Sequence, residues 1–321
     1  MPQIIKIDKD LSERIWAIKA IAVATIFFAH MPLVVNYPPM VEKIYQLIGW
    51  IGVPTFFIMS GFLYKTITYI GWIKKVKRLI VPLLIWGTLT YLVHCIPSNT
   101  AFSFVDLGKW IIGSKTYLYF VWVLLAIFIL YTLYDNPVLW IVIGIVSVIL
   151  TQYQIIHYTQ FWTPYMNPLN FISYFSIGIL LRRQNEIRSY LIRKSSLIIY
   201  VVLLSILCCT VVGLELTWYF NLHTHIAQIC SSLLIVALML VFQVKSKFLL
   251  YVGKTSFVIY LTHMQIASTI NKFAHHIPPY IEFMKVILAF AISLFAVYIL
   301  DCLTRKFFTK LNVHSYLGFI E

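Results

Sequence analysis

The feature that most constrains this chain is a succession of apolar stretches, each about as long as a membrane-spanning helix. A helix that crosses a bilayer needs about 20 mostly apolar residues. Ten stretches approach this length, at roughly 15–35, 44–64, 79–97, 116–134, 137–151, 168–183, 195–214, 225–243, 248–268 and 283–304. The sequence therefore predicts an all-α, polytopic transmembrane bundle of about ten helices.

The distribution of basic residues predicts how the bundle is oriented. Of the 25 Lys and Arg residues, 18 lie in segments on one side of the predicted spans and three lie within spans. The four on the other side are Lys43, Lys109, Lys115 and Lys272. Cytoplasmic segments of membrane proteins are enriched in Lys and Arg, so we expect both termini to be cytoplasmic. We expect a membrane domain over residues 11–310, with short cytoplasmic tails at 1–10 and 311–321.

Composition excludes several other classes of protein. Only 11% of the 321 residues are charged and 61% are hydrophobic. A soluble domain of this length could not bury so much apolar surface. The net charge of +14 follows from the positive-inside pattern, so we expect the lipid bilayer, and no nucleic acid, as a partner. The five cysteines show no C-x-x-C spacing, so we expect no metal site.

Lys19 and His30 are the first ionisable residues predicted at membrane depth. Eleven residues separate them, which in a helix is about 20° from three full turns and about 16 Å along the axis. Both side chains are therefore predicted on one face of the first helix. Such residues usually face a bundle interior or an aqueous cavity. A structural alternative is that Lys19 extends to the inner interface while His30 bonds a neighbouring helix.

His263 is predicted at a depth similar to that of His30, about 15 residues into a helix that also starts inside. A histidine suits general-base catalysis because its ordinary pKa lies near neutrality. The sequence leaves open whether the two histidines meet.

Four motifs, in this order and topology, resemble those of the acyltransferase-3 family of membrane O-acyltransferases. Lys19-x10-His30 is similar to the family's basic residue, ten others and a histidine. Gly52-Val-Pro-Thr-Phe-Phe-Ile-Met-Ser-Gly-Phe62 resembles its V-x-x-F-F-x-x-S-G-F/Y segment. Lys75 and Arg78 match the pair in R-x-x-R-L-x-x-P, and Val252 to His263 resembles L-G-x-x-S-F/L-x-I-Y-L-x-H.

The chain also departs from the family pattern. Lys19 stands where Arg is more common, which makes bidentate contacts to phosphate or carboxylate less favourable there. The family often has H-L-W-F-L near the fourth span, whereas this chain has Tyr117-Leu-Tyr-Phe-Val121 and so lacks that histidine. The esterase-like domain that is fused to some members is also missing.

The resemblance implies transfer of an acyl group, in the family most often acetyl, from cytoplasmic acyl-CoA to a hydroxyl of a surface or lipid-linked glycan. Acetyl-CoA would be a donor substrate, with no permanently bound cofactor, and the location a bacterial plasma membrane. We expect His30 as the base or transient acyl carrier, and His263 as the second choice. Lys19 would attract the negative charge of the CoA diphosphate or of an oxyanion, and Lys75 and Arg78 would hold CoA phosphates.

Alternatives accompany each of these expectations. Ten helices with few buried charges would also suit a transporter or flippase of lipid-linked sugar, although no inverted repeat supports this reading. A scaffold without catalysis would not explain the Lys19 and His30 pair. Ser60 and Gly61 are expected at a helix crossing rather than in catalysis. The aromatic outer segments, with Tyr165 and Tyr219 among their members, are expected to form an interfacial belt.

Overall fold

The structure is a computed structural model of the 321-residue chain. It describes residues 7–33, 37–65, 69–98, 101–114, 116–191, 193, 196–202, 204–205, 219–241, 246–273, 282–307 and 313–319. Most of the stretch predicted to span at 195–214 lies outside these residues, as does Trp218 of the predicted outer aromatic segment.

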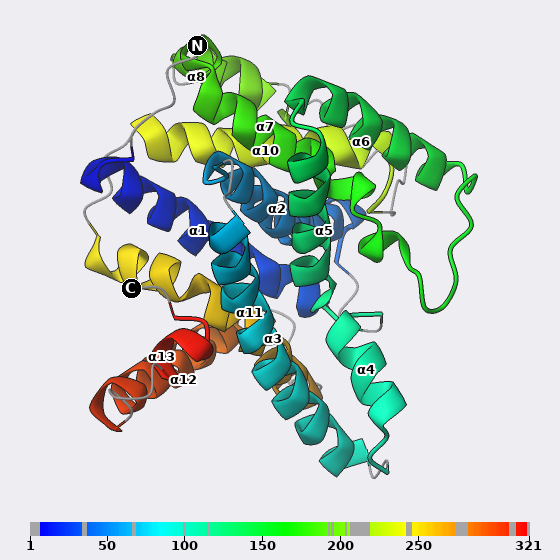
Figure 1. Ribbon diagram of the computed structural model, residues 1–321, viewed down its shortest axis with the longest axis vertical. Coiled ribbons are helices and arrows are strands. Elements are labelled where there is room, and N and C mark those ends of the chain that lie inside the picture. The colour runs from blue at the N-terminus through cyan, green and yellow to red at the C-terminus, as the bar shows by residue number, and fades with distance from the viewer. Residues whose placement is uncertain are drawn as a thin grey trace.

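The described residues form helices and no strands, so the prediction of an all-α bundle is confirmed (Figure 1). The first half of the chain contains α1 (Lys9–His30), α2 (Pro39–Phe62), α3 (Tyr69–Ser98), α4 (Phe104–Ile112), α5 (Tyr119–Leu133) and α6 (Pro137–Gln152). The second half contains η1 (Pro164–Met166), α7 (Leu169–Arg183), α8 (Asn185–Leu191), α10 (Leu222–Val241), α11 (Lys247–Phe273), α12 (Met284–Phe307) and α13 (Val313–Tyr316). The short helices α4, α8 and α13 were not predicted, because only runs of about 20 apolar residues were sought.

Polar caps explain where several helices begin. Asp8, Ser103 and Asn136 precede α1, α4 and α6, and each side chain accepts a hydrogen bond from a backbone N–H three residues later. Such caps satisfy donors that the first turn of a helix leaves unpaired. A polar side chain therefore sets the start of α1, α4 and α6, whereas α2, α5 and α7 begin without a side-chain cap.

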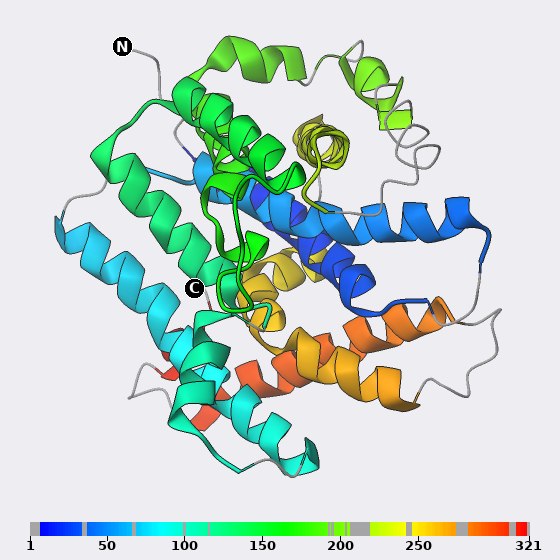
Figure 2. The same cartoon turned by 90° about the vertical axis from the view of Figure 1, so that its right-hand side faces the viewer.

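The interior is built on a few close helix pairs. α1 packs against α2 and α11, α2 packs against α7, and α7 packs against α6. Figure 2 shows α1 and α2 running side by side in opposite directions. A Cβ on Gly61 would lie 1.9 Å from the carbonyl oxygen of Phe175, and one on Gly178 would lie 1.9 Å from that of Ile58. The expected role of Gly61 at a helix crossing is thereby confirmed, since only glycine permits this approach.

One end of the bundle gathers the ends of helices that were predicted outside. The C-terminal end of α1 receives a hydrogen bond from Asn271 on α11, whose amide lies 3.1 Å from the carbonyl oxygen of His30. Lys285 on α12 donates to the carbonyl of Pro32 at 2.6 Å, and Tyr45 on α2 donates to that of Met31.

The opposite end gathers the helix ends that were predicted inside. Arg182 at the end of α7 donates to the carbonyl oxygens of Phe62 and Tyr64, just after α2. Arg183 forms an ion pair with Asp135 at 2.6 Å, between α5 and α6. The helices whose ends meet at these two places therefore run in alternating directions, as a polytopic topology requires, and the end with Arg182 and Arg183 is the one predicted to be cytoplasmic.

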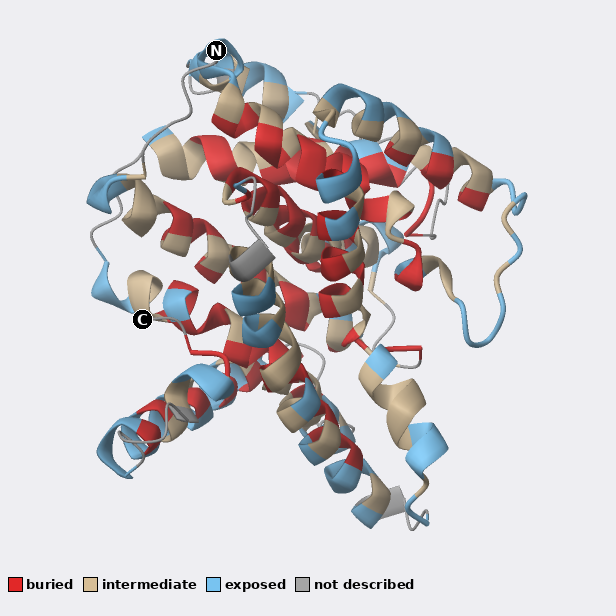
Figure 3. Ribbon diagram, in the orientation of Figure 1, coloured by how far each residue is buried: buried red, intermediate tan, exposed pale blue. Residues whose placement is uncertain are grey.

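The outer surface of several helices is apolar, as contact with lipid requires. Four helical segments have the length and composition of membrane spans: Pro39–Phe62, Gly71–Ile96, Leu222–Val241 and Met284–Phe307. Val93 on α3 and Phe295 on α12 are more than half exposed. Figure 3 shows buried residues concentrated in the main body, whereas exposed residues recur between buried and intermediate ones along α3 and α12. A soluble protein rarely exposes such large apolar surfaces, so the chain is an integral membrane protein.

The contact of α2 with α7 predicts how two glycine substitutions will differ. Gly178→Leu places a side chain against the backbone of Ile58 and should lower the free energy of unfolding by about 3 kcal/mol, the upper end of the usual overpacking cost. Gly108→Leu on α4 is the matched control, because a Cβ there has no neighbour within 4 Å. Thermal unfolding in detergent measures both. Equal losses of stability in the two variants would contradict the close α2–α7 crossing.

Candidate functional site

A close approach of α1 and α11 brings His30 and His263 together. A Cβ on Gly253 would lie 1.9 Å from the carbonyl oxygen of Trp16, so only glycine allows the two backbones to touch there. Farther along the same pair of helices, the rings of His30 and His263 lie with their centroids 5.0 Å apart. The two histidines therefore share one site.

His263 is held in one orientation. Its side chain is fully buried, and Nδ1 lies 2.6 Å from the carbonyl oxygen of Tyr260. A carbonyl only accepts, so Nδ1 carries the hydrogen and Nε2 of the neutral ring is the acceptor. Among the described residues Nε2 has no hydrogen-bond partner. The side chain thus presents an unsatisfied acceptor beside the ring of His30.

Tyr117 completes this cluster. It occupies the position where the family that the sequence motifs resemble often has a histidine. Its ring centroid lies 4.7 Å from that of His263. The hydroxyl donates to the carbonyl of Leu261 at 2.6 Å, and Gln265 Oε1 lies 3.2 Å away. Tyr260 donates in turn to the backbone carbonyl of Tyr117. These bonds tie the start of α5 to α11 and fix the wall around the histidines.

His30 faces a cavity of about 360 Å³, which we name the outer chamber. Its lining is rich in aromatic side chains, with small residues between them. The lining includes Ala29, His30, Gly49, Trp50, Gly113, Tyr117, Tyr119, Thr163, Tyr165, Tyr219 and Met264. Sequence reasoning assigned Tyr165 and Tyr219 to an interfacial belt, whereas the structure places both in the wall of this chamber.

Lys19 and Arg78 line a second, narrower cavity of about 130 Å³, which we name the inner chamber. Apart from these two cations, Ser60 and Ser256, its wall is largely apolar, with Phe56, Phe120, Leu124, Phe257 and Tyr260 among its residues. Lys19 Nζ lies 4.8 Å from the ring centroid of Trp16. In the part of the chain that the structure describes, no carboxylate forms an ion pair with Lys19 or Arg78.

The two chambers lie end to end. Ile26 and Val53 line both of them, so the two chambers adjoin at these side chains, which we call the neck. Lys19 and His30, predicted on one face of the first helix, thus line successive chambers about 16 Å apart along α1. The arrangement is two adjoining chambers, with two cations lining the inner one and an imidazole lining the outer one.

The structure separates the two residues predicted to hold CoA phosphates. Arg78 lines the inner chamber, whereas Lys75 does not. Lys75 Nζ instead lies 3.5 Å from the ring centroid of Phe128 and 5.3 Å from that of Tyr64. A cation over an aromatic face is a stabilising contact in its own right. Phosphate binding by Lys75 stays a prediction.

Comparison with known proteins identifies the family of the chain. The family model described as "Acyltransferase domain" matches residues 13–302, which is most of the chain. No curated protein and no solved structure matches the chain. The matched residues include Lys19 and His30 of α1 and His263 of α11. They also include the helices that form most of both chambers. The chain belongs to the acyltransferase-3 family of integral membrane acyltransferases.

Proposed function

We propose that the protein transfers an acyl group of the acetyl class from cytoplasmic acyl-CoA to a hydroxyl of a cell-surface or lipid-linked glycan. The observation that supports the proposal is the pair of chambers that adjoin at Ile26 and Val53, with two cations lining the inner one and His30 lining the outer one. The bacterial plasma membrane, expected from the family resemblance, is part of the same proposal.

The inner chamber suits an anionic donor with a long, slender arm. Two cations that line one cavity without an acidic partner among the described residues repel each other, and an anion bound between them would remove that cost. CoA carries phosphate groups at one end and its thioester at the other. With phosphates near Lys19 and Arg78, the pantetheine arm would lie along the apolar wall and bring the thioester past Val53 to His30.

The outer chamber suits the acceptor and the chemical step. The acceptor oxygen forms a bond to the thioester carbonyl carbon, and the carbon–sulfur bond breaks. His30 would take the hydroxyl proton, because a hydroxyl is a poor nucleophile until a base removes its proton. That proton would then pass to the departing thiolate, so the products are an ester and free CoA. In this proposal Nε2 of His263 accepts from the N–H of His30 and leaves the other nitrogen of His30 facing the chamber.

The aromatic wall of the outer chamber supports a sugar as the acceptor. Trp50, Tyr119, Tyr165 and Tyr219 surround the space in front of His30. Aromatic faces pack against the apolar faces of pyranose rings, and tyrosine hydroxyls can bond sugar hydroxyls. We do not adopt the transporter alternative, because the family match is to acyltransferase domains.

The role of His30 predicts the outcome of an acyl-transfer assay in membranes. With radiolabelled acetyl-CoA and surface glycan, wild-type protein should place label in an alkali-labile ester, and His30→Ala should lower the rate at least about 100-fold, as loss of a general base does. His94→Ala is the control, because His94 stacks on Trp110 at the outer end of α3, away from the chambers. Equal rates in the two variants would remove His30 from the mechanism.

The role of Arg78 predicts a selective effect on the donor. Arg78→Gln should raise the KM for acetyl-CoA by about 10-fold or more, because a charge-assisted hydrogen bond contributes about 1.5–3 kcal/mol. The KM for the acceptor should not change. Lys77→Gln on the same helix is the matched control, since Lys77 is exposed and does not line the inner chamber. A KM that rises equally in both variants would indicate general attraction by the basic surface.

A further inference from the structure

Residues 313–319, near the C-terminus, pack against the inner chamber. Gly318 lines this chamber together with Lys19 and Arg78. A Cβ on Gly318 would lie 3.0 Å from Phe257 Cδ1 and 3.4 Å from Pro82 Cβ, so the backbone itself is in contact with α11 and α3. Its φ of +97° is a conformation that favours glycine. We call residues 313–319 the strap.

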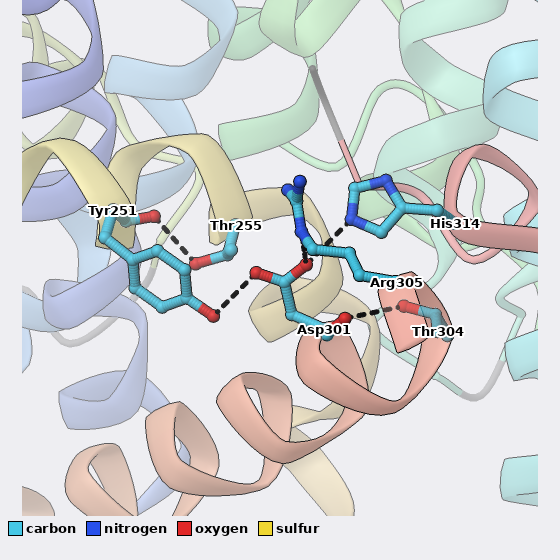
Figure 4. A network of polar contacts seen from close by, with 6 residues as sticks. All are labelled: Tyr251, Thr255, Asp301, Thr304, Arg305 and His314. Atoms are coloured by element: carbon cyan, nitrogen blue, oxygen red, sulfur yellow. Dashed lines mark hydrogen bonds and ion pairs between the residues drawn. The ribbon is translucent and has the colours of Figure 1, made fainter. Parts of the chain in front are cut away.

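One anchor of the strap is a polar cluster at the inner end of α12 (Figure 4). Asp301 Oδ1 accepts from Arg305 Nε at 2.6 Å, an ion pair four residues apart on α12. The same oxygen lies 2.8 Å from Nε2 of His314 in the strap, and Tyr251 of α11 donates to the other carboxylate oxygen at 3.2 Å. Asp301 therefore joins α11, α12 and the strap.

A second anchor lies on α3. Trp86 Nε1 donates to the backbone carbonyl of Leu317 at 3.0 Å. Phe319 is only 4% exposed and its ring stacks on that of His314, with centroids 4.5 Å apart. These contacts hold Gly318 between α3 and α11, at the end of the inner chamber where Lys19 and Arg78 lie. The strap lies beyond residue 302, where the family match ends.

We propose that the strap closes the inner chamber and forms part of the donor site, so that acyl-CoA can exchange only when residues 313–319 are displaced. Donor binding in this chamber rests on the proposed function, whereas closure of the chamber by the strap does not. The strap supplies a wall for the arm of the donor and slows its release. Weakening the anchors should therefore open the chamber and weaken donor binding, while the histidines keep their environment.

Closure can be tested without any activity by following one reporter cysteine. Ser60 lines the inner chamber, so a Ser60→Cys variant, made with the native cysteines replaced, reports access of a charged thiol reagent from the cytoplasmic face. In the full-length chain with its anchors intact, labelling should be slow. Adding His314→Ala and Trp86→Phe should accelerate it at least about 10-fold, since two hydrogen bonds of about 1 kcal/mol each hold the strap.

The controls separate release of the strap from loss of the fold. Tyr316→Ala alters an exposed strap residue and should leave labelling slow. His314→Gln keeps a donor for Asp301 and should restore much of the protection. Equal labelling rates with intact and weakened anchors, in variants that unfold at the wild-type temperature, would overturn closure by the strap.

Donor binding provides the second readout. CoA added at saturation should protect the cysteine, and in the assay the weakened anchors should raise the KM for acetyl-CoA several-fold while the acceptor KM stays the same. If weakened anchors accelerate labelling but CoA does not protect the cysteine, closure by the strap stands and the donor site is contradicted. If CoA protects the cysteine but the anchors change neither labelling nor KM, the donor site stands and closure by the strap is contradicted.

Discussion

The contact between α1 and α11 is the interaction on which the site depends. Where Gly253 meets the backbone of Trp16, two helices far apart in sequence approach without side chains between them. Such close packing gains dispersion energy and weak Cα–H···O contacts, the main sources of helix association in lipid. It also fixes the register in which His30 lies beside His263 and Lys19 opens onto the inner chamber. A bulkier residue at position 253 would push α1 and α11 apart and so separate the histidines without contacting either of them.

Several polar and charged side chains of the bundle line the two adjoining chambers. A lysine near the centre of a membrane helix costs about 2.5–3.5 kcal/mol by insertion scales, so its presence calls for a functional explanation. Here Lys19 and Arg78 face the same narrow cavity, Ser60 and Ser256 lie in its wall, and His30 lies beyond the neck. The remaining wall is apolar and excludes water from the arm of a bound substrate. Both cations therefore line one cavity, where a bound anion would offset their mutual repulsion.

Much of this arrangement follows from the sequence, because helix periodicity is local. The apolar runs, the basic asymmetry and the common face of Lys19 and His30 need only spacing along one chain segment. The meeting of His30 with His263 needs long-range packing, which depends on one glycine among 12. Lys75 and Arg78 are three residues apart on α3, and only the rotation of α3 against α11 determines which of the two side chains faces the inner chamber. Tyr165 and Tyr219 could not be distinguished from a belt in a chain that is 17% aromatic. The strap is only seven residues long, far shorter than the apolar stretches from which helices were predicted.

The central claim is that one passage connects a cytoplasmic donor site to His30. A structure of the protein in lipid with a non-hydrolysable thioether analogue of acetyl-CoA tests it most directly. The account predicts phosphates beside Lys19 and Arg78, the arm between Ile26 and Val53, and the acyl carbon within reach of the His30 ring. An analogue bound with its arm outside the neck, or with its acyl end away from both histidines, would contradict the account.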